Sequence, residues 1–263
     1  IKFGTPKIFK LKNGIQVLVV EDNKLPAVTY SLTIDRNPIL DGNKVGVSSI
    51  LSAMLGNGTT SIPKDEFNEE VEFLGASVSV TFSGGSANTL TKNNDRVLEL
   101  WSDAIINPLL LEEEFDKEKT KLSESLKADV NNIDAIADRV SSALSYGKEH
   151  PYGEFLSQET LNNVTFQDVL DYHAKYYIPN NAYLVVVGDV NTKEIKSVLK
   201  EKFDKWKKGK MPENPEPSYT ENLGLTEVNF IDVPSATQST IIFTNNTKLK
   251  SSDEDYFTAF LGV

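Results

Sequence analysis

Residues 7–21, KIFKLKNGIQVLVVE, indicate the fold class most directly, because polar and apolar residues alternate on both sides of Asn13-Gly14. An Asn-Gly dipeptide between two alternating runs is the strongest short-range signal of a β-hairpin. A second hairpin is predicted over residues 77–91, where two strands flank Ser83-Gly84-Gly85-Ser86. Strands joined in this way pair antiparallel, so the sequence predicts a largely antiparallel sheet.

Segments with helical periodicity alternate with these strands. The clearest is an apolar set that recurs every three or four residues and stops at two glycines: Val47, Ile50, Leu51, Met54 and Leu55. Further helices are predicted at residues 61–74, 95–106, 112–130, 134–146, 166–177 and 192–203, and further strands at 27–34 and 182–187. We therefore predict an α/β (α+β) two-layer domain over residues 1–205, with the sheet covered on one face by helices.

The C-terminal part of the chain has a different composition. Residues 206–224 are rich in lysine and proline, which predicts a semi-rigid linker with solvated lysines. Beyond it, strands are predicted at 228–232 and 239–244, and a helix begins at Ser252 and enters an apolar run. A helix with an unburied apolar stripe needs a partner surface, so residues 225–263 are interpreted as the truncated start of a second domain.

Composition excludes several classes of protein. The 263 residues are 39% apolar and 25% charged, which is typical of a folded protein, and no apolar run is long enough for a transmembrane helix. There is no cysteine, and the net charge of -11 argues against nucleic-acid binding. The chain has two histidines, His150 and His173, too far apart to share one helical face. We expect His150 to shape a loop and His173 to lie on the exposed or half-buried side of its helix.

Five short segments, in this order and spacing, resemble the first half of the insulinase, pitrilysin and mitochondrial-processing-peptidase superfamily: Leu11–Ile15, Val47–Thr59, Leu74–Ala76, His150–Gly153 and Tyr176–Asp189. The resemblance covers essentially the whole chain. It implies the α/β fold of processing-peptidase-like metallohydrolases, followed by the start of a second copy of that fold.

Active members of this superfamily bind zinc through a helical His-x-x-Glu-His motif and a distal glutamate. Aligning Met54-Leu55 and Gly58-Thr59 with the family pattern places the four functional positions at residues that cannot replace these groups: Ser49, Ser52, Ala53 and Ser125. Glu124 is adjacent to the last position, but a shift of one residue rotates a side chain by about 100° around a helix. The resemblance therefore implies no bound metal, no cofactor and no catalytic residue, so the chain alone is not expected to be an enzyme.

In this superfamily two homologous halves enclose a peptide, and commonly only one binds zinc. The resemblance thus implies a non-catalytic subunit or half of an insulinase-like peptidase that binds an extended peptide and completes the chamber of a zinc-bearing homologous partner or of a second copy. Peptide contacts are expected from an edge strand in the 77–91 hairpin, at Ser86, Ala87, Asn88 and Thr89. The alternative is a scaffold protein like the respiratory-complex core subunits. A periplasmic or otherwise exported location is expected, with the cytoplasm as the alternative.

Overall fold

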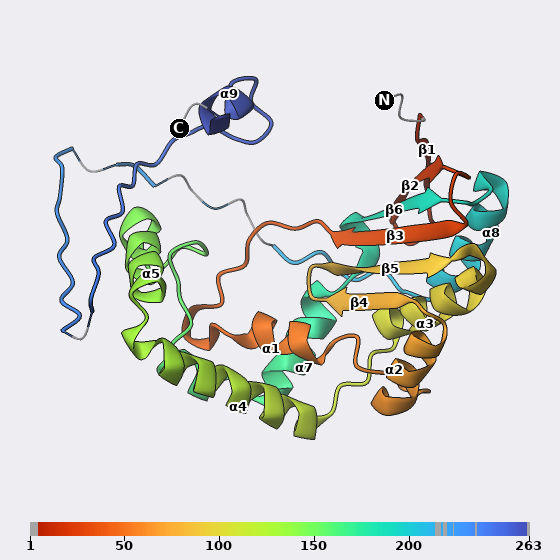
Figure 1. Ribbon diagram of the computed structural model, residues 1–263, viewed down its shortest axis with the longest axis horizontal. Helices are drawn as coiled ribbons and strands as arrows, with labels where there is room; N and C mark the ends of the chain where they lie inside the picture. The colour runs from red at the N-terminus through yellow and green to blue at the C-terminus, as the bar shows by residue number, and fades with distance from the viewer. Residues whose placement is uncertain (1–4, 214–216, 218–219, 223, 235, 262–263) are drawn as a thin grey trace.

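Six strands form one sheet in the computed structural model, which describes residues 5–213, 217, 220–222, 224–234 and 236–261. The strands, with the order β1-β2-β6-β3-β5-β4 across the sheet, are β1 (Lys7–Lys10), β2 (Gln16–Glu21), β3 (Ala27–Ile34), β4 (Ser77–Thr81), β5 (Gly84–Leu90) and β6 (Ala182–Gly188). Figure 1 shows β1 and β4 at opposite edges of the sheet.

The sheet is largely antiparallel, as predicted. The hairpins β1–β2 and β4–β5 form, and β3 pairs antiparallel with both β5 and β6. The exception is β6, which runs parallel to β2 and lies between β2 and β3. The centre of the sheet therefore joins the beginning of the domain to a strand more than 150 residues later in the chain.

The predicted helices are present, with small shifts at their ends, and one further short helix, Gln158–Asn163, has no counterpart in the sequence predictions. Their bounds are α1 (Val47–Met54), α2 (Lys64–Phe73), α3 (Asn94–Ile106), α4 (Glu112–Ala128), α5 (Ile133–Tyr146), α6 (Gln158–Asn163), α7 (Phe166–Tyr176), α8 (Thr192–Phe203) and α9 (Tyr256–Leu261). Side-chain oxygens of Asn132, Ser157, Thr165 and Asn191 accept backbone N–H groups at the starts of α5, α6, α7 and α8. These caps satisfy donors that have no partner within the helix.

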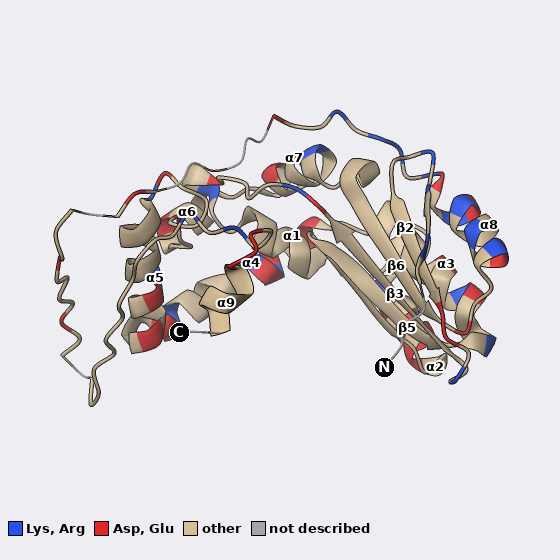
Figure 2. Cartoon of the chain, turned by 90° about the horizontal axis from the view of Figure 1, so that it is seen from above, with Lys and Arg blue, Asp and Glu red and all other residues tan. Residues whose placement is uncertain are grey.

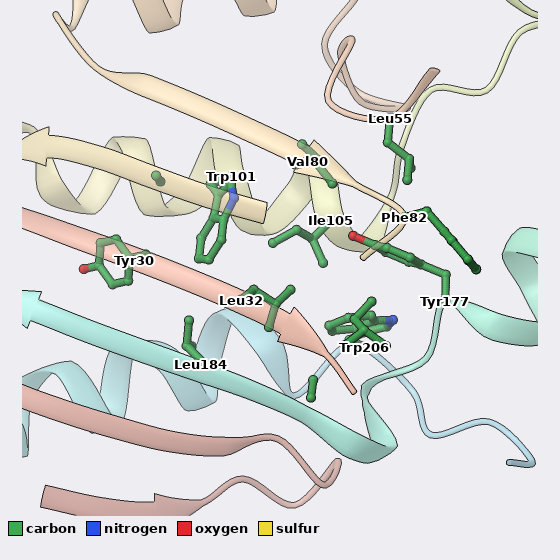
Figure 3. Close-up of a cluster of buried hydrophobic side chains, with 14 of the residues drawn as sticks. Tyr30, Leu32, Leu55, Val80, Phe82, Trp101, Ile105, Tyr177, Leu184 and Trp206 are labelled. Carbon is green, nitrogen blue, oxygen red and sulfur yellow. The ribbon is translucent and has the colours of Figure 1, made fainter. Parts of the chain in front are cut away.

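One face of the sheet is buried and the other is open. Along β3, Tyr30 and Leu32 are buried, whereas Ser31 and Thr33 between and after them are exposed. The buried side chains pack against α3 and α8, which lie on the same side of the sheet (Figure 2). Figure 3 shows Trp101 of α3 reaching into this core. This arrangement confirms the two-layer prediction.

The first domain extends past the predicted boundary at residue 205. Trp206 is 6% exposed and its ring packs on that of Tyr177, with 5.4 Å between the ring centroids. Further along, the Gly209 N–H donates to Asn180 Oδ1 and Asn180 Nδ2 donates to the Gly209 carbonyl, at 3.0 and 2.9 Å. The first residues of the predicted linker are therefore bound to the domain.

The two strands predicted beyond the linker are not formed in the described residues between 224 and 250. Phe230 and Phe243, which belong to those segments, are 88% and 94% exposed. An isolated β-segment has no ladder and no apolar surface to pack on, so strand propensity alone does not form a strand. The helix predicted from Ser252 is present as the short α9. None of the helices in the described part of the chain has the length and apolar character needed to cross a bilayer.

Candidate functional site

Helix α1 carries three of the four positions that the sequence analysis aligns with the superfamily's catalytic motif. Its rotation is fixed by the buried stripe Val47, Ile50, Leu51 and Met54. With that stripe packed inward, Ser49 and Ala53 are exposed, one helical turn apart, and Ser52 is half-buried. These positions therefore remain on the side of the helix that is not used for packing in the core.

The fourth position, Ser125, lies on α4, which packs beside α1 (Figure 1). Ser125 and its neighbour Glu124 are both exposed. Zinc sites in proteins are built from imidazole, thiolate and carboxylate ligands, and Ser49, Ala53 and Ser125 supply none of these. Among the residues that the structure describes, no three His, Asp or Glu side chains are grouped to hold a metal ion. These residues do not fit zinc, and we assign them no metal chemistry.

Ser52 instead makes a structural hydrogen bond. Its Oγ accepts the backbone N–H of Phe82 at 3.1 Å. Phe82 directly follows β4, so the position that resembles the catalytic glutamate joins α1 to the end of a strand. Alignment alone identifies Ser52 as an empty position and does not reveal this contact.

The expected peptide contacts do not lie on an edge strand. Ser86, Ala87, Asn88 and Thr89 belong to β5, which pairs with β3 on one side and β4 on the other. Their backbone cannot accept another strand, so their placement on an edge is wrong. The reason is strand order: the second strand of the hairpin turns inward to β3, and the first remains outside. Peptide contact by the Ser86 and Asn88 side chains, which lie on the open face, stays untested.

The free edge next to α1 belongs to β4. Within the described residues, β4 pairs with β5 alone. The Ser79 carbonyl points toward β5, since a side-chain carbon at Gly85 would lie 2.3 Å from its oxygen. Neighbouring residues of a strand direct their backbone groups to opposite sides, so Val78 and Val80 direct theirs outward. Gly56, after α1, lies against Val80: a side-chain carbon there would be 3.2 Å from its nitrogen. Gly56 therefore covers the edge at Val80, and the half-buried Val78 lies on the part of the edge that has no strand partner among the described residues.

Both histidines lie where the sequence predicts them, His150 in a loop and His173 on the half-buried side of its helix. His150 is buried between the rings of Tyr146 and Tyr152, and its Nδ1 accepts the Tyr152 N–H at 3.1 Å. His173 is half-buried and stacks on Tyr177, and burial lowers the pKa of His173 to about 4. His173 is therefore neutral at physiological pH.

A half-buried polar cluster near α1 has no counterpart in the sequence predictions. Asp41, just before the short helix Gly42–Lys44, accepts the Tyr172 hydroxyl at 2.8 Å, and its N–H donates to the Glu154 carboxylate at 3.0 Å. Burial, partly offset by the Tyr172 hydrogen bond, raises the pKa of Asp41 to about 6. Asp41 is more than 110 residues away in sequence from both of these partners. No local pattern could have revealed them.

Asp41 should make stability depend on pH. Its pKa is higher in the folded than in the unfolded chain, so its contribution to stability is fully present below about pH 4 and is lost as the pH rises through 6. Asp41→Asn keeps an acceptor for Tyr172 and should raise the free energy of unfolding at pH 7.5 by about 1–2 kcal/mol, discounted for partial exposure. Urea unfolding at pH 4.5, 6 and 7.5 measures this. A difference between wild type and variant that does not change with pH would contradict the assignment.

Comparison with known proteins places this geometry in a family. The profile described as "Insulinase (Peptidase family M16)" matches residues 16–151, more than half of the chain, and "Peptidase M16 inactive domain" matches residues 163–261. The chain belongs to peptidase family M16. The boundary between the two matches lies before β6, so it does not coincide with the end of the first domain.

Relatives within family M16 include bacterial zinc proteases. An uncharacterized zinc protease of Rickettsia felis is 29% identical over 77% of this chain and 50% of its own length. The zinc protease PqqE of Helicobacter pylori is 29% identical over 75% of this chain and 46% of its own length. The chain thus spans about half the length of these two relatives.

Solved structures share the fold. An M16 inactive domain from Pseudomonas fluorescens superimposes with a TM-score of 0.73 at 21% identity, over 81% of this chain and 54% of that one. The first half of the periplasmic protease PqqL from Escherichia coli gives 0.67 at 20% identity, over 84% of this chain and 50% of that one. These similarities support the M16 fold in the described part of this chain.

The M16 chain is expected to bind no stoichiometric zinc. The physical reason is the donor set at positions 49, 52, 53 and 125, where three hydroxyls and a methyl replace imidazoles and carboxylates. Elemental analysis after metal stripping and reloading with zinc measures this, with a zinc-bearing family member as positive control. One tightly bound zinc per chain would contradict the prediction.

Proposed function

We propose that this chain is a non-catalytic half or subunit of an M16 peptidase, which binds an extended peptide along the free edge of β4 and completes the chamber of a zinc-bearing homologous partner. The observation that carries the proposal is the unpaired edge of β4 beside α1, a helix from which the zinc ligands are missing. A free edge recognises the backbone of an extended peptide and tolerates many sequences.

The comparisons with known proteins support both a partner subunit and an exported location. The two zinc proteases named above are about twice the length that this chain spans, and one matching family profile is described as an inactive domain. One structural neighbour is the first half of a protease described as periplasmic. By analogy with these proteins, we propose that the partner of this chain is a zinc-bearing homologue or a second copy. We also propose that the chain is located in the periplasm or in another exported compartment.

Val78→Pro tests peptide binding at the edge. Proline removes an N–H that points away from β5, so it should abolish strand addition while the sheet remains intact. The measurement is a fluorescence-anisotropy titration of a proline-free Ala/Gly/Ser/Lys peptide with the zinc-bearing complex that contains this subunit. Val78→Thr, which has nearly the same shape and keeps the N–H, is the control.

The outcomes separate the two functions considered. Loss of binding in Val78→Pro, with normal binding in Val78→Thr, supports capture on β4. Equal affinity in both variants would exclude the β4 edge as the peptide site. No peptide binding by the wild-type complex would favour a scaffold role instead. A pull-down with full-length protein, asking whether a zinc-bearing homologue is recovered, tests the partner separately.

A further inference from the structure

Phe82, the residue after edge strand β4, is held from three directions. Its N–H donates to Ser52 Oγ of α1 at 3.1 Å, and its carbonyl accepts Arg36 Nη2, after β3, also at 3.1 Å. The Arg36 guanidinium carbon lies 3.7 Å from the centre of the Phe82 ring, and the Tyr172 ring of α7 packs on it with 4.9 Å between centroids. Phe82 is 5% exposed. Both backbone groups and the ring of this residue are therefore fixed.

The position of Arg36 is unfavourable for an isolated cation. The residue is half-buried, and burial lowers the pKa of its guanidinium. Its Nη1 is buried and has no hydrogen-bond partner among the described residues. A buried donor without a partner costs stability, and an apolar side chain of similar length would avoid this cost. What the guanidinium provides at this place is its hydrogen bond and ring contact with Phe82.

The Tyr172 side of this arrangement is itself anchored. The Tyr172 hydroxyl donates to Asp41 Oδ1 at 2.8 Å, and α1 packs against α7. Elements that are distant in sequence thus converge on the residue at which β4 leaves the sheet.

We infer that Ser52 and Arg36 are positioning residues for peptide capture: they fix the end of β4 so that its outward backbone groups are ordered before a peptide arrives. The inference rests on the proposed function. In this reading the position that resembles the catalytic glutamate serves as a hydrogen-bond acceptor for the edge strand. Ordering a binding edge in advance improves affinity because the entropy of ordering is not lost on association.

Ser52→Ala tests this role. Removal of the hydroxyl should raise the hydrogen-exchange rate of the Phe82 amide and weaken peptide binding, each on the order of tenfold, the effect of one hydrogen bond. Ser52→Thr should restore both, because threonine supplies the same acceptor. Ser49→Ala, an exposed serine on the same helix, is the matched control and should change neither. The peptide and complex are those used for Val78→Pro.

Arg36→Met separates positioning from stability. Methionine keeps an apolar contact with the Phe82 ring but cannot donate a hydrogen bond to the Phe82 carbonyl. It also removes the buried Nη1, which has no hydrogen-bond partner among the described residues. The peptide dissociation constant should rise on the order of tenfold, while the thermal midpoint stays near the wild-type value. A residue with a purely structural role would lower the midpoint and the affinity together, and that result would overturn the inference for Arg36.

These experiments distinguish failure of the positioning role from failure of the proposed function. A wild-type complex that binds peptide, together with Ser52→Ala that binds equally well, overturns the positioning role and leaves the proposed function standing. A wild-type complex that binds no peptide overturns both. Unchanged exchange at the Phe82 amide in Ser52→Ala overturns the inference whatever the affinity.

Discussion

Ser86→Pro should lower the free energy of unfolding by about 2–4 kcal/mol, the cost of a lost ladder hydrogen bond together with the acceptor that it leaves unpaired, which is a large part of the total for a domain of this size. Ser86 lies in the middle of β5 and is paired with Ser79 of β4 and with Ser31 of β3. Proline removes its N–H from the ladder with β4, and its ring crowds the neighbouring backbone. Because both sides of β5 are occupied, the strand cannot move outward to relieve this strain.

Urea unfolding followed by circular dichroism measures the loss. The matched comparison is Val78→Pro, which places the same residue in the adjacent edge strand, where the lost N–H faces away from the sheet. The loss there should be clearly smaller. Equal stability of Ser86→Pro and wild type would contradict the internal position of β5.

Trp101→Ala should cost about 3–5 kcal/mol, the range for removing a large buried aromatic side chain. Trp101 is fully buried on α3, and its ring lies 5.8 Å from that of Tyr30 and 6.0 Å from that of Phe203, between centroids. Its Nε1 donates to the Ser79 carbonyl at 3.2 Å. The substitution thus opens a cavity between the sheet and two helices.

Trp101→Phe is the control for that prediction. Phenylalanine retains much of the buried ring and loses the hydrogen bond to Ser79, so it should cost clearly less than alanine. Thermal and urea unfolding of the two variants give the comparison. Similar losses would show that the hydrogen bond to β4, and not the packing of α3, dominates.

Local patterns predicted the elements of this fold well. The Asn13-Gly14 turn and the apolar stripe of α1 are encoded within a few residues, so both hairpins and the longer helices could be predicted directly, whereas the six-residue helix α6 was missed. Strand order is different, because it depends on which strands meet in three dimensions. The sequence alone could not show that β5 turns inward to β3, which is why Ser86–Thr89 were placed on an edge.

In the candidate site, too, features encoded by local sequence could be predicted, whereas contacts between distant residues could not. The empty positions 49, 52, 53 and 125 follow from aligned motifs in the chain. The contacts of Arg36 with Phe82, and of Asp41 with Tyr172, join residues 46 and 131 positions apart. An arginine after an apolar strand is a weak signal for a buried cation, and nothing near Asp41 indicates its partner. The prediction of strands at 228–232 and 239–244 was wrong although their local β-propensity was clear, because no neighbouring strand pairs with them in the described residues.

The insertion of β6 between β2 and β3 has a consequence for synthesis on the ribosome. Neither β2 nor β3 can complete its hydrogen bonds until residues 182–188 have left the exit tunnel, and Asn13 must wait for Phe203 and Trp206, whose carbonyls it binds. Contacts of such long sequence separation form late, since loop closure must precede them. A nascent chain that ends before β6 therefore presents the flanks of two incomplete strands, and we expect it to depend on chaperones until that last strand is released.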